Sequence, residues 1–121
     1  MASLNTISAV ISAGQSLSSA ADASGCTRIA RIVMPSDWSG GAPLTFQLSV
    51  DNVNFHDLYH VDPSTFYSFE VQAPRPVPGS VLTLPPGLGG AISFVRVRSG
   101  TRSLPIPQDA DRTFTFVCEM P

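Results

Sequence analysis

The segment "LTFQLSV", Leu44 to Val50, alternates apolar with polar residues and decides the fold class. Successive side chains of a β-strand point to opposite faces, so Leu44, Phe46, Leu48 and Val50 would share one face. Burying four such side chains contributes roughly 6–12 kcal/mol before the cost of chain entropy is subtracted. The segment therefore predicts a strand with one face in a hydrophobic core.

The same period of two recurs in short segments, which predicts strands at residues 5–12, 15–21, 30–34, 44–50, 67–71, 80–84, 93–99 and 112–120. The residues expected to point inward from the other well-patterned strands are Ala30, Ile32, Met34, Leu82, Leu84, Val95, Val97, Phe114, Phe116 and Cys118. Eleven prolines and nine glycines punctuate the chain and leave little room for a long amphipathic helix. We therefore predict an all-β fold, a single-domain antiparallel β-sandwich that is jelly-roll-like and has about eight short strands. The domain is expected to span residues 1–121, with residues 1–12 as an N-terminal arm or an edge strand.

Charge and hydropathy restrict the classes of partner. Only 13% of the 121 residues are charged and the net charge is −2, a composition that suits a chain packed against other protein copies. The sequence has no basic stripe, so we expect no direct contact with nucleic acid. No apolar window is long enough to span a membrane, and polar residues interrupt the apolar residues before Cys26, so we expect neither a membrane anchor nor a signal peptide. The chain is thus expected to be made and assembled in the cytoplasm.

His56 and His60 raise the possibility of a metal site. On a helix, residues four apart lie about 6 Å from each other and could bind one ion. On a strand they lie about 13 Å apart, which no single ion spans. Because Asp51 and Asn52 suit a tight turn after the preceding strand, a hairpin return is the favoured reading. We therefore expect no metal and no cofactor.

Signals for catalysis are weak. The three aspartates Asp51, Asp57 and Asp62 lack the spacing of a calcium loop, and no GxSxG segment presents a nucleophile. Cys26 and Cys118 fit buried small apolar residues better than a disulfide in a reducing compartment. Whether they pair is left open, since a bridge requires the two ends of the chain to lie side by side. We expect a protein that is not an enzyme and has no catalytic residues.

Three segments could contact a partner. Trp38 lies in a loop, where it could be exposed as an interface anchor or a sugar platform, or could fold over the end of the sandwich. The outward side of the 93–99 strand combines arginine with phenylalanine, as interfaces do, although a solvated sheet face has the same pattern. The N-terminal segment could add a strand to a neighbour. The candidate interface residues are Leu4, Ile7, Val10, Trp38, Phe94, Arg96 and Arg98.

Five segments, in this order, resemble small structural proteins of tailed bacteriophages and prophages: "ISAGQSLSSAAD", "IVMPSDW", "LTFQLSVDNVNFHDLY", "FVRVRSGT" and "RTFTFV". The segments "LSVDNVNFHDLY" and "FVRVRS" also resemble strands of discoidin-type jelly rolls. The sequence departs from that pattern at Asn52, where a glycine is usual, and asparagine also tolerates a left-handed turn.

The resemblance implies a component of the virion. The expected function is a capsid decoration or cement protein, at the capsid surface, that binds adjacent major capsid protein subunits as a homo-oligomer, with a trimer favoured. The alternative is a carbohydrate- or receptor-binding module of a tail, baseplate or head fibre. A weaker alternative is a head–tail connector or tail-completion protein.

Overall fold

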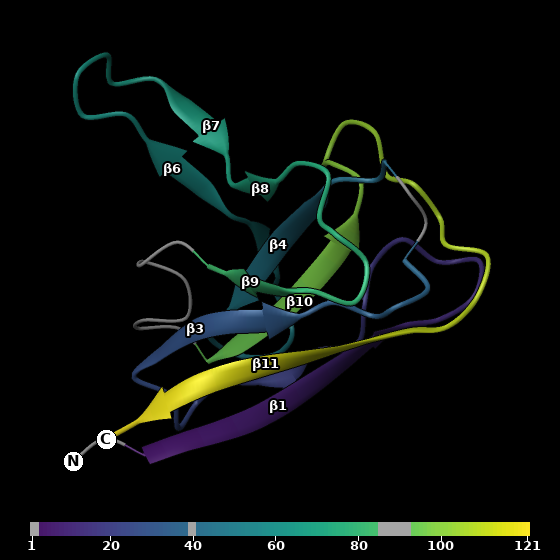
Figure 1. Ribbon diagram of the computed structural model, residues 1–121. Helices are drawn as coiled ribbons and strands as arrows, with labels where there is room; N and C mark the ends of the chain where they lie inside the picture. Colours follow the sequence, from purple (N-terminus) through teal and green to yellow (C-terminus); the bar gives the residue numbers. More distant parts are fainter. Residues whose placement is uncertain (1–2, 39–40, 85–92) are drawn as a thin grey trace.

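The computed structural model describes residues 3–38, 41–84 and 93–121, and its strands form two antiparallel sheets and a separate hairpin (Figure 1). The first sheet has the order β1 (Ser3–Ile11), β11 (Arg112–Met120), β3 (Arg28–Val33) and β9 (Val81–Thr83). The second has the order β2 (Ala21–Asp22), β10 (Phe94–Ser99), β4 (Leu44–Ser49) and β5 (His56–Asp57), and β8 (Gln72–Ala73) also pairs with β4. The hairpin consists of β6 (Tyr59–Val61) and β7 (Ser68–Glu70). The prediction of an all-β antiparallel sandwich is confirmed.

The described residues form eleven strands, whereas the sequence predicts about eight. Two single residues account for much of the difference. Leu58 separates β5 from β6, and Val71 separates β7 from β8. The Leu58 amide donates to the Phe46 carbonyl, and the Val71 amide donates to the Leu58 carbonyl. At this point the chain leaves the second sheet and continues as the β6–β7 hairpin.

The central strands of the second sheet, β4 and β10, pair antiparallel along their whole length. Leu44 and Phe46 are buried in the core, and so are Val95 and Val97, as the alternation predicts. Val50 is 72% exposed, so the prediction that it is buried is wrong. The strand ends at Ser49, because the Ser49 hydroxyl accepts hydrogen bonds from the Asp51 and Asn52 amides and begins a turn.

In the first sheet, Phe114, Phe116 and Cys118 of β11 are buried as predicted, and so are Ile32 and Met34. Ala30 is only half-buried, and Ile29 is buried in its place. The β11–β3 register shifts between Val117 and Cys118, which pair with Arg31 and Ile29, so Ala30 is skipped as a bulge. The bulge changes the phase of the alternation and turns both Ile29 and Ile32 inward.

The first residues of the chain lie at the edge of the first sheet. β1 pairs with β11 through nine consecutive residues, from Ser3 to Ile11. Residues 1–2 of the expected arm lie outside the described part of the chain. The strand expected at 15–21 is reduced to the bridge between Leu17 and Arg98 and to β2. Within the described residues there is no helix that could cross a membrane.

Candidate interaction surface

The β6–β7 hairpin projects from the sandwich and carries a set of exposed apolar side chains (Figure 1). Their exposed fractions range from 42% to 81%, and the residues are Tyr59, Val61, Phe66, Tyr67 and Phe69. On one side of the hairpin, the His60 and Phe69 rings lie 5.3 Å apart, centroid to centroid. Single exposed apolar residues are common on proteins, but a cluster of aromatic residues on one projecting element is typical of a contact surface.

The tip of the hairpin holds Phe66 in an unusual backbone conformation. Its φ angle is 63°, in the left-handed region that bulky residues rarely adopt, and its side chain is 81% exposed. The Phe66 amide donates to the Asp62 carbonyl at 2.7 Å, and the Asp62 amide donates to the Tyr67 carbonyl at 2.9 Å. Hydrogen bonds from the Ser64 amide and hydroxyl lower the pKa of the Asp62 carboxyl. The turn therefore holds a large aromatic side chain outward at a conformational cost, which is a feature of functional sites.

The base of the hairpin is fixed by a buried arginine. Arg98 of β10 is 5% exposed, and its guanidinium forms ion pairs with Asp57 of β5 and with Glu70 of β7, the latter at 3.2 Å. Both carboxylates are themselves largely buried. The Gln47 side chain also donates to Asp57, at 3.3 Å. These contacts attach β7 to the second sheet directly, and they also hold β5, the strand that leads into β6, so the base of the hairpin is fixed to the sandwich.

Arg102 extends this cluster towards the surface. Its amide donates to Glu70 at 3.1 Å, and its Nε lies 3.5 Å from an Asp57 oxygen. A hydrogen bond with Tyr59, followed by attraction to Tyr59 and Asp57, raises the pKa of the Arg102 guanidinium. The cluster thus continues to the first exposed aromatic residue of the hairpin.

The predicted interface on β10 has a different role in the structure. The Arg98 side chain is buried and forms intramolecular ion pairs, so it offers little surface to a partner. Arg96 is half-buried, and its guanidinium carbon lies 3.8 Å from the centre of the Phe55 ring. Phe94 is half-buried too. The side of β10 expected to face outward is therefore covered by the chain segment that leads into the hairpin.

Trp38 is 4% exposed, so of the two alternatives the structure shows the tryptophan folded over the sandwich, and Trp38 offers no surface as an interface residue. Its ring meets Phe114 edge to face at 5.5 Å, and its Nε1 donates to the Ala42 carbonyl at 3.2 Å. Nearby, the buried Arg112 is paired with Asp37 at 2.8 Å. These contacts hold the Trp38 loop against the core.

The three apolar candidates on β1 differ in exposure. Leu4 is 70% exposed, whereas Ile7 and Val10 are half-buried and Ile7 packs against the core. Ala9 and Ile11, further along the strand, are fully buried. The first half of β1 is thus the part available to a partner.

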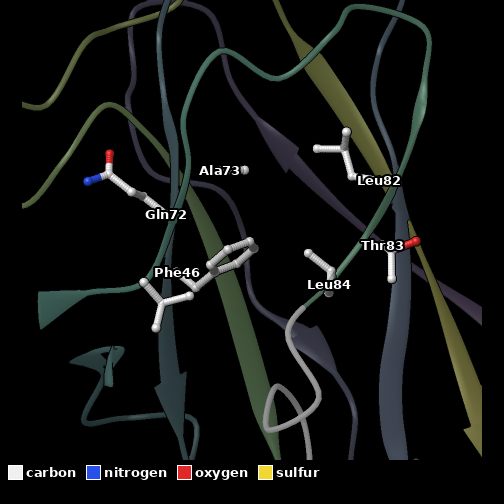
Figure 2. Close-up of a pocket in the computed structure, with 7 residues that line it drawn as sticks. Phe46, Gln72, Ala73, Leu82, Thr83 and Leu84 are labelled. Carbon is white, nitrogen blue, oxygen red and sulfur yellow. The ribbon is translucent and has the colours of Figure 1, made fainter. Parts of the chain in front are cut away.

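A cavity of about 310 Å³ opens between the two sheets (Figure 2). Phe46 and Leu84 point into it, while the Gln72 side chain points away. The remaining lining residues are Val71, Ala73, Leu82 and Thr83. None of these seven residues is ionisable, so the cavity suits a small apolar group and supplies no acid or base.

The histidines lie on strands, as the favoured prediction has it. His56 pairs with Leu48 in β5, and His60 pairs with Phe69 in the hairpin. Among the described residues, no three His, Cys, Asp or Glu side chains are grouped so that they could hold a metal ion.

Cys26 and Cys118 are free thiols that lie next to each other. Burial, together with the hydrogen bond and the electrostatic interaction between Cys118 and Cys26, raises the pKa of the Cys118 thiol to about 12. The Thr27 amide and hydroxyl both donate to the Glu119 carbonyl, which places Cys26 beside the last strand. A buried protonated thiol is a poor nucleophile.

The hairpin surface is not among the interface residues predicted from the sequence, although the sequence contains a signal for it. The segment "VDPSTFYSFE" contains a turn signal, Asp62 to Ser64, followed by three aromatic residues within four positions. Aromatic residues so close to a turn cannot contact the core when the hairpin projects from the sandwich. The sequence does not indicate whether the hairpin projects.

Known proteins offer no direct guide to this surface. No family model, no curated protein and no solved structure matched the chain.

Proposed function

We propose that the chain is a bacteriophage virion structural protein, a capsid decoration protein that binds adjacent major capsid subunits through its β6–β7 hairpin. The resemblance to small phage structural proteins supports the virion setting. The observation that carries the mode of action is the rigid hairpin with its exposed Tyr59, Phe66, Tyr67 and Phe69. The function is attachment to protein, and no bond is made or broken.

The affinity of a contact surface depends on how much ordering it undergoes on binding. Aromatic side chains supply large buried areas and dominate the binding energy of protein interfaces. A flexible hairpin would lose much of that energy as conformational entropy on binding. Here the Arg98 ion pairs with Asp57 and Glu70 fix the base of the hairpin, at the end of β5 and at β7, before any partner arrives. The hairpin is therefore preorganised to insert between subunits of a shell.

The test is cosedimentation of the purified chain with expanded empty capsids of the phage that encodes it. We expect saturable binding with on the order of hundreds of copies per shell, as a symmetric lattice of sites requires. Replacing Phe66→Gly together with Tyr67→Ser should weaken binding by roughly 30-fold or more, since each residue would act as a hot spot.

The design separates binding from folding. Glycine accepts the left-handed conformation at position 66 without strain, so the double variant should remain folded, as checked by thermal unfolding. The matched control is Val53→Ser, which removes a 77% exposed apolar residue away from the hairpin and should bind as wild type. Equal binding by the double variant and the wild type would rule out the hairpin as the contact.

A second candidate is a glycan-binding module of a tail or fibre, favoured by the 78% exposure of Tyr67, whose ring could stack on a sugar. Binding to cell-surface polysaccharide, combined with tens of copies or fewer per particle, would select this candidate over capsid decoration.

A further inference from the structure

The edge strands of the two sheets, within the described residues, are unequal in length. β2, β5 and β8 have two residues each and β9 has three, whereas β1 has nine. Short edge strands are one way in which proteins prevent unwanted pairing of exposed backbone groups. β1 lacks this protection.

β1 also lacks the other protective features. Its sequence, "SLNTISAVI", contains no charged residue and no proline. Its register with β11 runs without a shift from Ser3 to Ile11, so no bulge interrupts the strand. Charges, prolines and bulges are the usual devices that keep an edge free of partners. An edge without any of them is suited to pairing.

The hydrogen bonds of Val10 show which backbone groups of β1 point away from β11. The Ser19 amide donates to the Val10 carbonyl at 2.9 Å, and the Val10 amide donates to the Ser19 hydroxyl at 3.1 Å, so both Val10 groups point away from β11. In an antiparallel ladder, every second residue directs both of its groups to the same side. The amides and carbonyls of Leu4, Thr6 and Ser8 therefore point outward from the sheet.

We propose that this edge pairs antiparallel with β1 of a second copy of the chain, about a two-fold axis at Thr6. In that register Thr6 faces the partner's Thr6, and Leu4 faces the partner's Ser8. The three outward residues of each copy would form about six backbone hydrogen bonds between the copies. The two four-stranded sheets would join into one continuous sheet.

The chemistry of β1 favours a second copy over a different protein. With the two-fold axis at Thr6, Thr6 meets its own equivalent and the residues on either side of it lie close to the axis, so a charged edge would bring like charges together there. β1 has none between Ser3 and Ile11. Leu4, which is 70% exposed, would also gain an apolar diagonal neighbour in the partner's Val10.

This inference does not depend on the virion function, and it changes the expected oligomer. An isologous pair closes as a dimer, whereas a cyclic trimer would need the β1 edge to meet a different surface. No described edge other than β1 is long enough to match it.

The test uses charges placed on the proposed axis and sedimentation velocity on the full chain at micromolar concentrations. Wild type should be a dimer. Thr6→Lys and Thr6→Glu should each be monomeric, because like charges would then face each other. A one-to-one mixture of these variants should form a heterodimer, which shows that neither change unfolds the chain.

The matched control is Thr113→Lys, which places the same charge on the exposed outer side of β11, an interior strand, and should leave the dimer intact. A monomeric or trimeric wild type would overturn the proposal. So would a dimeric Thr6→Lys variant, a mixture that stays monomeric, or dissociation caused by Thr113→Lys.

Discussion

At the scale of single residues, Arg98 is the side chain on which the hairpin depends. A guanidinium at 5% exposure is tolerated because carboxylates from two strands, Asp57 and Glu70, compensate its desolvation. Those carboxylates are distant in sequence, 41 and 28 residues away. The ion pairs thus connect the sandwich to the hairpin that we propose as the contact surface.

Replacing Arg98 with methionine should lower the free energy of unfolding by about 3–5 kcal/mol, because two largely buried carboxylates would lose their cation. Denaturant titration measures the loss. The control is Arg28→Met, which removes an exposed ion pair with Glu119 at 3.2 Å and should cost about 0–1 kcal/mol. Similar losses in the two variants would contradict the structural role given to Arg98.

The Cys118 thiol should make the free energy of unfolding depend on pH in the alkaline range. Its pKa in the folded protein is about 12, above the ordinary value of 9.0, so the native state retains a proton that the unfolded chain releases. This contribution to stability is complete below pH 9.0 and is lost as the pH rises towards 12. We expect the free energy of unfolding of the wild type to fall more steeply above about pH 9 than that of a Cys118→Val variant. Parallel curves, measured by denaturant titration, would show that Cys118 does not carry the effect.

At the scale of elements, the turn after β10 depends on Gly100. Its φ angle is 93°, and a Cβ there would lie 2.4 Å from the Leu104 carbonyl oxygen and 2.7 Å from the Ile106 nitrogen. Gly14, with a φ of 84°, has open space around the same position. Both glycines adopt a left-handed conformation, but only Gly100 lacks room.

Gly100→Ala should therefore destabilise the protein by clearly more than about 1 kcal/mol, and Gly14→Ala by about 1 kcal/mol. The difference between the two melting curves isolates the steric clash from the backbone strain. Equal losses would mean that the backbone around Gly100 relaxes without cost.

The strands themselves follow well from the sequence, because a half-buried strand alternates apolar and polar residues. Val95 and Val97 of β10, and Phe114 and Phe116 of β11, are buried as that pattern predicts. The pattern fails where local geometry changes its phase, as at the Ala30 bulge. Nothing in the local sequence marks that bulge, since the partner strand determines it.

The residues of the candidate interaction surface are much harder to predict from the sequence than the strands are. Trp38 and Arg98 look like surface residues until their partners are known, and those partners come from distant strands or from the end of the sandwich. Conversely, Phe69 fits the pattern of a core-facing residue but is 52% exposed, because β7 belongs to the projecting hairpin and the chain returns to the second sheet only after Val71. Periodicity identifies which residues share a face but not what covers it.

At the scale of the whole molecule, the two proposed contact regions belong to different elements. The hairpin extends from the β4 and β5 side of the second sheet, and the β1 edge belongs to the first sheet (Figure 1). Each region can therefore be altered without the other. A dimer joined through β1 would present two hairpins to a surrounding shell.

The most direct test of the central claim is a density map of the intact particle at a resolution that shows side chains. Our account predicts the chain on the capsid surface, with Phe66 and Tyr67 of the hairpin buried against a major capsid subunit. A chain absent from the shell, or one bound with its hairpin facing solvent, would contradict the account.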